Sequence, residues 1–164
     1  LDSGSNSKFN AIAKEAAGFV SEAYQLYKLK NTVSGSTWFG DFTPYINYVK
    51  QDTMSLIDRY QGGTFFDCSL VGEYCLVLHN GAIIRYAPQS TFSDTLPTNA
   101  IFFEIDPDGK YSGSATGPGK SPIFILYTTG MLRTWGTMEP GTFVNSGLNN
   151  PNPSLDPPWF SWSN

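Results

Sequence analysis

The chain has 164 residues and a formal net charge of −4, and 15% of its residues are charged, against about 25% in typical soluble domains. This length suits one domain with a hydrophobic core. Gly, Ser, Thr, Asn and Pro take the place of the missing charged residues. This composition is typical of an extracellular, turn-rich protein rather than of a cytosolic enzyme. The ten Lys and Arg residues are scattered along an acidic chain, which disfavours nucleic acid as a partner.

The N-terminal region predicts a long amphipathic helix. Residues 1–6 are small and polar, and we interpret them as a cloning junction that replaces natural upstream sequence. From Ser7, a residue suited to cap a helix, apolar residues recur at helical spacing and predict a helix over 7–30. Its apolar face consists of Phe9, Ile12, Ala13, Ala16, Val20, Ala23, Tyr24 and Tyr27. Phe19 and Leu26 lie off this face, so they contact either a second core element or a neighbouring subunit.

A shorter second helix is predicted in the connection that follows. Residues 31–41 are rich in Gly, Ser and Thr and end the first helix. Thr43 and Pro44 then supply a cap and a proline at the first helical position. Apolar residues follow at roughly helical spacing, which predicts a helix over 44–60.

From Thr64 the pattern changes to short runs rich in aromatic and β-branched residues, which are typical of strands. The predicted strands are 64–67, 73–79, 81–87, 100–105, 123–127 and 131–135. Asn80 and Gly81 suit the two central positions of a type I′ turn and predict a β-hairpin. The order of elements predicts an α+β fold, in which an N-terminal helix packs on an antiparallel β-meander sheet, with the short second helix in the connection.

The two cysteines, Cys68 and Cys75, form no Cys-x-x-Cys pair, so neither a zinc site nor a redox motif is predicted. They flank a short loop and are predicted to form a disulfide, which implies an oxidising compartment; two separate buried thiols are the alternative. His79 is the only histidine and adjoins the hairpin turn. We expect it to face solvent rather than to act in catalysis, because a catalytic His needs a nucleophile or carboxylate within reach.

Two loops resemble ligand-binding motifs without completing them. Asp106 and Asp108, in the run Asp-Pro-Asp-Gly, resemble the opening of a calcium loop, but Lys110 stands where the next acidic ligand belongs. A β-turn is therefore favoured. Residues 117–121 resemble the end of a phosphate-binding loop, but Pro118 removes a donor amide and a strand follows. No metal and no cofactor is predicted.

The C-terminal tail, residues 136–164, is rich in Pro and aromatic residues. Four prolines between positions 149 and 158 exclude a helix there. Trp159 and Trp162 are costly to leave in water, so we expect the tail to pack on the domain over 7–135. Together with Trp38 they are candidates for surface binding, because exposed aromatic rings stack on sugars or contact partner subunits.

Residues 7–135 resemble the globular head of type IV pilin-like proteins, the group that includes minor pilins and type II secretion pseudopilins. One feature is the Ala-rich amphipathic opening helix. The others are the run Tyr-Cys-Leu-Val-Leu-His-Asn-Gly-Ala-Ile-Ile at 74–84, Phe-Phe-Glu-Ile-Asp-Pro-Asp-Gly at 102–109, a Gly-Pro loop at 117–120, a Phe-bearing strand at 123–127 and a Gly-containing turn at 129–132. The tail after Trp135 has no counterpart in this pattern.

The resemblance implies a structural filament subunit without enzymatic activity, which serves assembly and surface display in adhesion, motility, DNA uptake or secretion. A hydrophobic segment upstream would anchor the precursor in the inner membrane, and the mature subunit would lie in an extracellular filament or at the cell surface. Its partners would be other pilin subunits, and Cys68 and Cys75 would staple the entry to the sheet. The helix residues expected in packing and assembly are Phe9, Ile12, Ala16, Phe19, Val20, Tyr24 and Leu26.

Two other classes of function compete with the filament subunit. One is a tip-located minor pilin or secreted binding module that recognises glycan or DNA through exposed aromatic side chains. The other is a small secreted enzyme, which the single histidine and the lack of a nucleophile-base motif disfavour.

The predicted disulfide can be tested on the purified chain. Denatured without reductant, Cys68 and Cys75 should resist alkylation, and after reduction both should be alkylated. Reduction should lower the free energy of unfolding by roughly 2.5 kcal/mol, the chain-entropy value for so short a loop. Alkylation of both cysteines without reductant, measured by intact mass, would identify two separate thiols.

Overall fold

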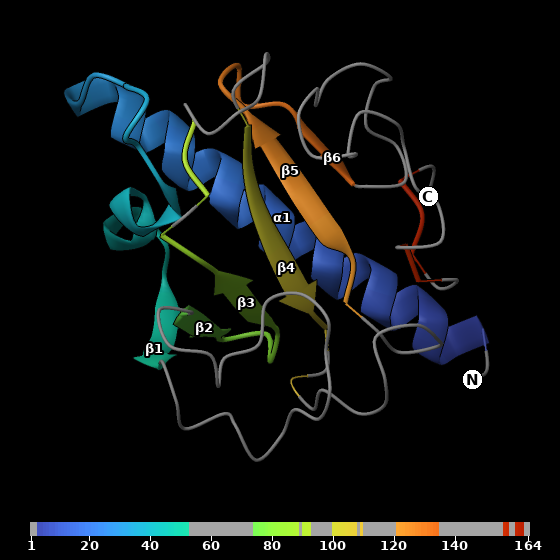
Figure 1. Cartoon of the computed structure of the whole chain (residues 1–164). Helices are drawn as coiled ribbons and strands as arrows, with labels where there is room; N and C mark the ends of the chain where they lie inside the picture. The colour runs from blue at the N-terminus through green and yellow to red at the C-terminus, as the bar shows by residue number, and fades with distance from the viewer. Residues whose placement is uncertain are drawn as a thin grey trace.

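The structure, a computed structural model, describes residues 3–52, 74–88, 90–92, 100–107, 109, 121–134, 156–157 and 160–162. Within these residues one long helix, α1 (Ser3–Lys30), lies across one face of a six-stranded antiparallel sheet (Figure 1). No helix in this part of the chain combines the length and the apolar character that a membrane span requires.

The sheet is a meander in which each strand pairs with its neighbour in sequence. Its strands are β1 (Tyr48–Asp52), β2 (Tyr74–Leu78), β3 (Ile83–Tyr86), β4 (Ala100–Asp106), β5 (Ile123–Tyr127) and β6 (Leu132–Thr134). The order across the sheet is β1-β2-β3-β4-β5-β6, and every pair is antiparallel. The predicted α+β fold is therefore confirmed; the predicted strand at 64–67 lies outside the described residues.

Small residues form the side of α1 that packs on the sheet. The fully buried residues of α1 are Ala13, Ala16, Ala17, Val20, Ala23 and Tyr24. Alanine favours the helix and adds little bulk, so the backbone of α1 can approach the sheet closely. The predicted start at Ser7 is wrong: α1 begins at Ser3, because extending a formed helix costs far less than nucleating one.

The predicted second helix over 44–60 is wrong across its described part. The connection contains two 3₁₀ helices, η1 (Phe39–Asp41) and η2 (Thr43–Tyr45), and the chain then enters β1. Pro44 does open a helical turn, as its fixed φ favours. Beyond it, pairing of β1 with β2 satisfies the backbone, and the aromatic and β-branched pair Tyr48 and Val49 suits a strand. Residues 53–60 lie outside the described part.

Both described hairpins turn through three residues and use a glycine in the left-handed conformation. Between β2 and β3, the Gly81 amide donates to the Leu78 carbonyl (3.1 Å), and Gly81 has φ 90°. The hairpin is confirmed, but the type I′ assignment is wrong, because His79 and Asn80 are the central residues and Gly81 follows them. The β5–β6 turn repeats this pattern, with Gly130 at φ 91°.

The sheet face opposite α1 is also buried, and it holds an ion pair. Ile84 and Tyr86 belong to the core on the α1 side, so the alternating residue Arg85 points to the other face. There it pairs with Glu104, its register partner on β4, and the two side chains are 3% and 6% exposed. Removing one partner of such a pair leaves a buried charge and costs several kcal/mol, so the pair specifies the register of β3 against β4.

The described part of the C-terminal tail packs against α1 and β5. The Ser161 amide donates to the Asn10 side chain on α1 (3.1 Å). Phe160 is buried, and its ring lies 5.4 Å from that of Phe124 in an edge-to-face contact. The tail therefore adds an aromatic contact at the β5–β6 end of the sheet.

The small residues of α1 make a stability prediction. Ala16→Leu should lower the free energy of unfolding by about 1–3 kcal/mol, because the larger side chain overpacks the buried side of α1. Ala11→Leu, on the same helix but exposed, should change it by less than about 0.5 kcal/mol. Urea unfolding of both variants measures the difference, and equal stability would contradict close helix–sheet packing.

Candidate functional site

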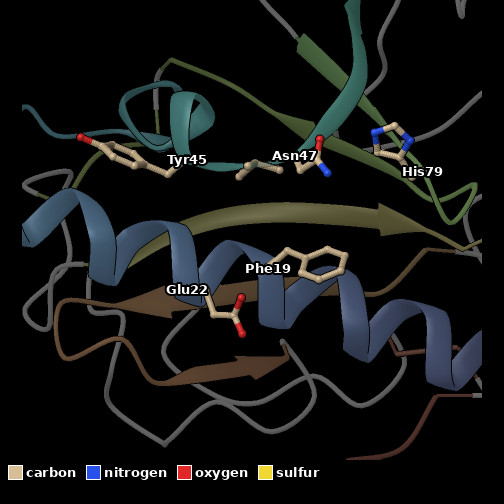
Figure 2. A pocket seen from close by; sticks show the side chains of 6 residues that line it. Phe19, Glu22, Tyr45, Asn47 and His79 are labelled. Atoms are coloured by element: carbon tan, nitrogen blue, oxygen red, sulfur yellow. The ribbon is translucent and has the colours of Figure 1, made fainter.

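A groove of about 310 Å³ lies between α1 and the segment that leads into β1 (Figure 2). Its lining residues are Phe19, Glu22, Tyr45, Ile46, Asn47 and His79. The first two come from the middle of α1, residues 45–47 connect η2 to β1, and His79 follows β2. The fold thus brings three separate stretches of sequence to one place on the surface.

Aromatic packing holds the 45–47 wall against α1. Phe42, which directly precedes η2, is fully buried. Its ring lies 5.1 Å from the ring of Tyr24 and 5.4 Å from that of Tyr27, both edge to face. Ile46 is also buried and lines the groove. Because the core contacts of Phe42 position this wall, its place does not depend on the polar side chains at the rim.

A hydrogen bond from the β2–β3 turn holds the opposite end of the groove. The Asn80 amide donates to the Glu15 carboxylate of α1 (2.8 Å), and the Ala82 amide donates to the Asn80 side-chain oxygen (3.0 Å). Glu15 lies one helical turn before Phe19 on α1. This contact therefore places His79, an exposed side chain as expected from its turn, across from Phe19.

The far end of α1 is held by the β5–β6 turn. The Ser21 hydroxyl donates to the Gly130 carbonyl (2.9 Å), and the Tyr24 hydroxyl donates to the Thr128 carbonyl (2.6 Å). Burial raises the pKa of Tyr24, and the nearby Tyr27 raises it further, so the hydroxyl remains a donor at neutral pH. Gly130 has φ 91°, a conformation that residues with a side chain rarely adopt, so a substitution there would be strained.

Phe19 and Leu26, which lie off the buried face, are exposed in the structure. Phe19 is 38% exposed, Leu26 46% and Leu29 78%. Their spacing of seven and three residues places them on one outward side of α1. We call these three residues the outward line. Of the two predicted roles, a second core element does not cover Phe19 or Leu26 within the described part of the chain; contact with a neighbouring subunit stays a prediction.

The candidate binding tryptophans have different environments. Trp38 is half-buried, and its ring lies 5.8 Å from each of the rings of Tyr74 and Tyr86, so it is packed rather than free to stack on a ligand. Trp162 is 37% exposed and meets Phe124 edge to face. Trp159 lies outside the described residues.

Neither Cys75 nor Asp106 lines the groove. Cys75 is buried on β2, in register with Arg85 on β3. Cys68 lies outside the described residues, so the disulfide stays a prediction. Asp106 is buried at the end of β4, and Asp108 lies outside the described part. Among the described residues, no group of three or more His, Cys, Asp or Glu side chains could hold a metal ion.

Sequence reasoning missed most of the groove, and it also missed Leu29 of the outward line. The signal for Leu29 was present in the sequence, because Leu29 follows Leu26 by three residues and so extends the same helical side. Tyr45 and Asn47 could not be found, because the segment that carries them was predicted as a helix. Glu22 became part of a site only when the 45–47 wall was placed opposite it.

The groove has a lining of mixed apolar and polar character. It combines two aromatic rings, one buried aliphatic side chain and three polar groups. Its volume is at the lower end of the range of roughly 300–1,000 Å³ for small-molecule pockets, so it suits one bulky side chain or a small ligand. Comparisons with protein-family models, with curated proteins and with solved structures find no match to the chain.

The contact between Asn80 and Glu15 predicts a variant whose stability depends on pH. Asn80→Asp should lower the free energy of unfolding by about 1 kcal/mol at pH 7, because it replaces a hydrogen bond with two facing carboxylates. Their repulsion acts only while both carboxyls are ionised. The loss should therefore be present at neutral pH and disappear below about pH 4, where the carboxyls become protonated.

A reversed pair is the matched control. In Glu15→Gln combined with Asn80→Asp, the amide and the carboxylate exchange places, and stability at pH 7 should recover. Thermal unfolding at pH 3.5 and pH 7 measures both variants. A deficit in Asn80→Asp that is the same at the two pH values would contradict the contact.

Proposed function

We propose that this chain is a structural subunit of a type IV pilus or related filament, and that α1 contacts neighbouring subunits through the outward line. The observation that carries the proposal is this line itself. Its three large apolar side chains are 38%, 46% and 78% exposed, and they share one side of a helix whose other side is fully buried. Single exposed apolar residues are common on protein surfaces, whereas aligned ones mark contact surfaces.

The architecture supports the same proposal. The resemblance implies an N-terminal helix laid across an antiparallel meander, and α1 has this relation to β1–β6. In a filament of such subunits the helix would have two roles, one side packing on its own sheet and the other meeting neighbours. The proposed role is assembly and surface display outside the cell, from a precursor anchored in the inner membrane.

Substitution on the outward line tests the proposal in the cells that produce the protein. The wild-type chain should be recovered in the sheared filament fraction and labelled along filaments by a specific antibody. Leu26→Glu should reduce the recovered amount at least roughly tenfold, because it buries a charge at the contact between subunits. Val49→Glu is the control: it is a similarly exposed apolar residue (55%) but lies on β1 and outside the outward line, so filaments should persist.

The purified Leu26→Glu chain should unfold at the wild-type temperature, which separates assembly from folding. Wild-type protein found only free in the medium, with none in filaments, would overturn the proposal. So would a coding sequence in which an ordinary cleavable signal peptide leads directly into residue 7.

A further inference from the structure

We infer that the groove beside Phe19 receives Leu29 of a second copy of this chain, so that copies add head to tail along the outward side of α1. This inference rests on the proposed function and deepens it by naming the two surfaces that meet. It also assigns an occupant to a groove that would otherwise expose Phe19.

Leu29 has the character of a protruding contact residue. At 78% exposure it is the most exposed of the large apolar side chains in the described part of the chain. It lies in the last turn of α1, one residue before the exposed Lys30. Leu26 lies one turn earlier on the same side and is 46% exposed, so the end of α1 presents an apolar tip beside a positive charge.

The groove has the complementary character. Ile46 supplies a buried apolar side chain to the lining, and the rings of Phe19 and Tyr45 also belong to it. A leucine side chain placed there would cover apolar atoms of all three residues, and burial of apolar surface favours the contact. The small volume of about 310 Å³ matches one or two aliphatic side chains better than an extended ligand.

The charges of the two surfaces are opposite. Glu22 lines the groove, and Glu15 lies one turn before Phe19, so the middle of α1 is acidic on its outward side. The end of α1 carries Lys30. Docking of Leu29 in the groove therefore brings Lys30 of one copy toward Glu22 of the next.

The spacing along α1 decides how copies are related. Leu29 lies about 15 Å beyond Phe19 along the helix. Two parallel copies shifted by that distance therefore bring Leu29 of one copy level with Phe19 of the other. This contact joins different surfaces and leaves one tip and one groove open at the ends, so it continues into a filament. An antiparallel pair would instead use both contacts at once and close as a dimer.

Cysteine cross-linking of the purified full chain separates these arrangements. Thr32→Cys and Asn47→Cys place thiols just beyond the tip and on the exposed groove wall, and both leave Leu29 in place. The variant carrying both should give, under mild oxidation at high protein concentration, a ladder of dimers, trimers and larger species on a non-reducing gel. Thr32→Cys with Ala11→Cys, an exposed position away from the groove, and the wild-type chain should give no ladder. Dimers alone would overturn the head-to-tail contact, as would ladders of equal strength in the control.

A charge exchange tests the contact independently of folding. Glu22→Lys in the cross-linking background should reduce the ladder roughly fivefold, the upper range for an exposed ion pair, and adding Lys30→Glu should restore it. The yield of cross-linked species should also fall as the salt concentration rises from about 0.01 to 1 M, because the Debye screening length falls from roughly 30 to 3 Å. A ladder that is indifferent to charge and to salt would overturn the inference.

The failure of this contact and of the proposed function can be told apart. Wild-type protein in cellular filaments without a tip-to-groove cross-link would overturn the contact and leave the filament role intact. A charge-dependent ladder from purified protein with no filaments in cells would support the contact between copies and overturn the filament role.

Discussion

Close packing of the small-residue side of α1 on the sheet is the constraint on which the rest of the structure depends. Because alanines occupy this side, the helix backbone lies near enough for polar side chains at its flanks to reach the surrounding turns. Those contacts are Glu15 with Asn80, Ser21 with Gly130, Tyr24 with Thr128 and Asn10 with Ser161. Each is a hydrogen bond that would break if bulkier side chains moved α1 away from the sheet, because the donor and the acceptor would then be too far apart.

The same packing decides which side chains of α1 remain for other uses. A helix that commits one side to the sheet presents the opposite side to solvent, and here that side carries the outward line. The turn after β2 and the segment after η2 are drawn against α1 by Asn80 and Phe42. The groove therefore follows from core packing and from one turn contact, and no part of it requires a separate stabilising element.

The other face of the sheet obeys a different constraint. β5 is buried along its whole length. On the face away from α1, the neighbouring strands β3 and β4 carry the buried pair of Arg85 and Glu104. An ion pair in such a place adds little net stability, but a one-residue slip of β3 against β4 would separate the two charges. The pair thus makes the central register specific, whereas the helix-facing side supplies apolar burial through residues such as Phe103 and Phe124.

The sequence by itself determined the elements whose signal is local. The helical spacing in α1, the runs of aromatic and β-branched residues and the glycines of the two hairpins predicted the α+β meander, because these signals are set within a few residues. Only the tertiary structure decided that Tyr48–Asp52 is a strand, since its partner β2 is distant in sequence. It also decided that Leu29 is exposed and that Tyr45 and Phe19 line the same groove, because burial and grooves depend on which distant segments pack together.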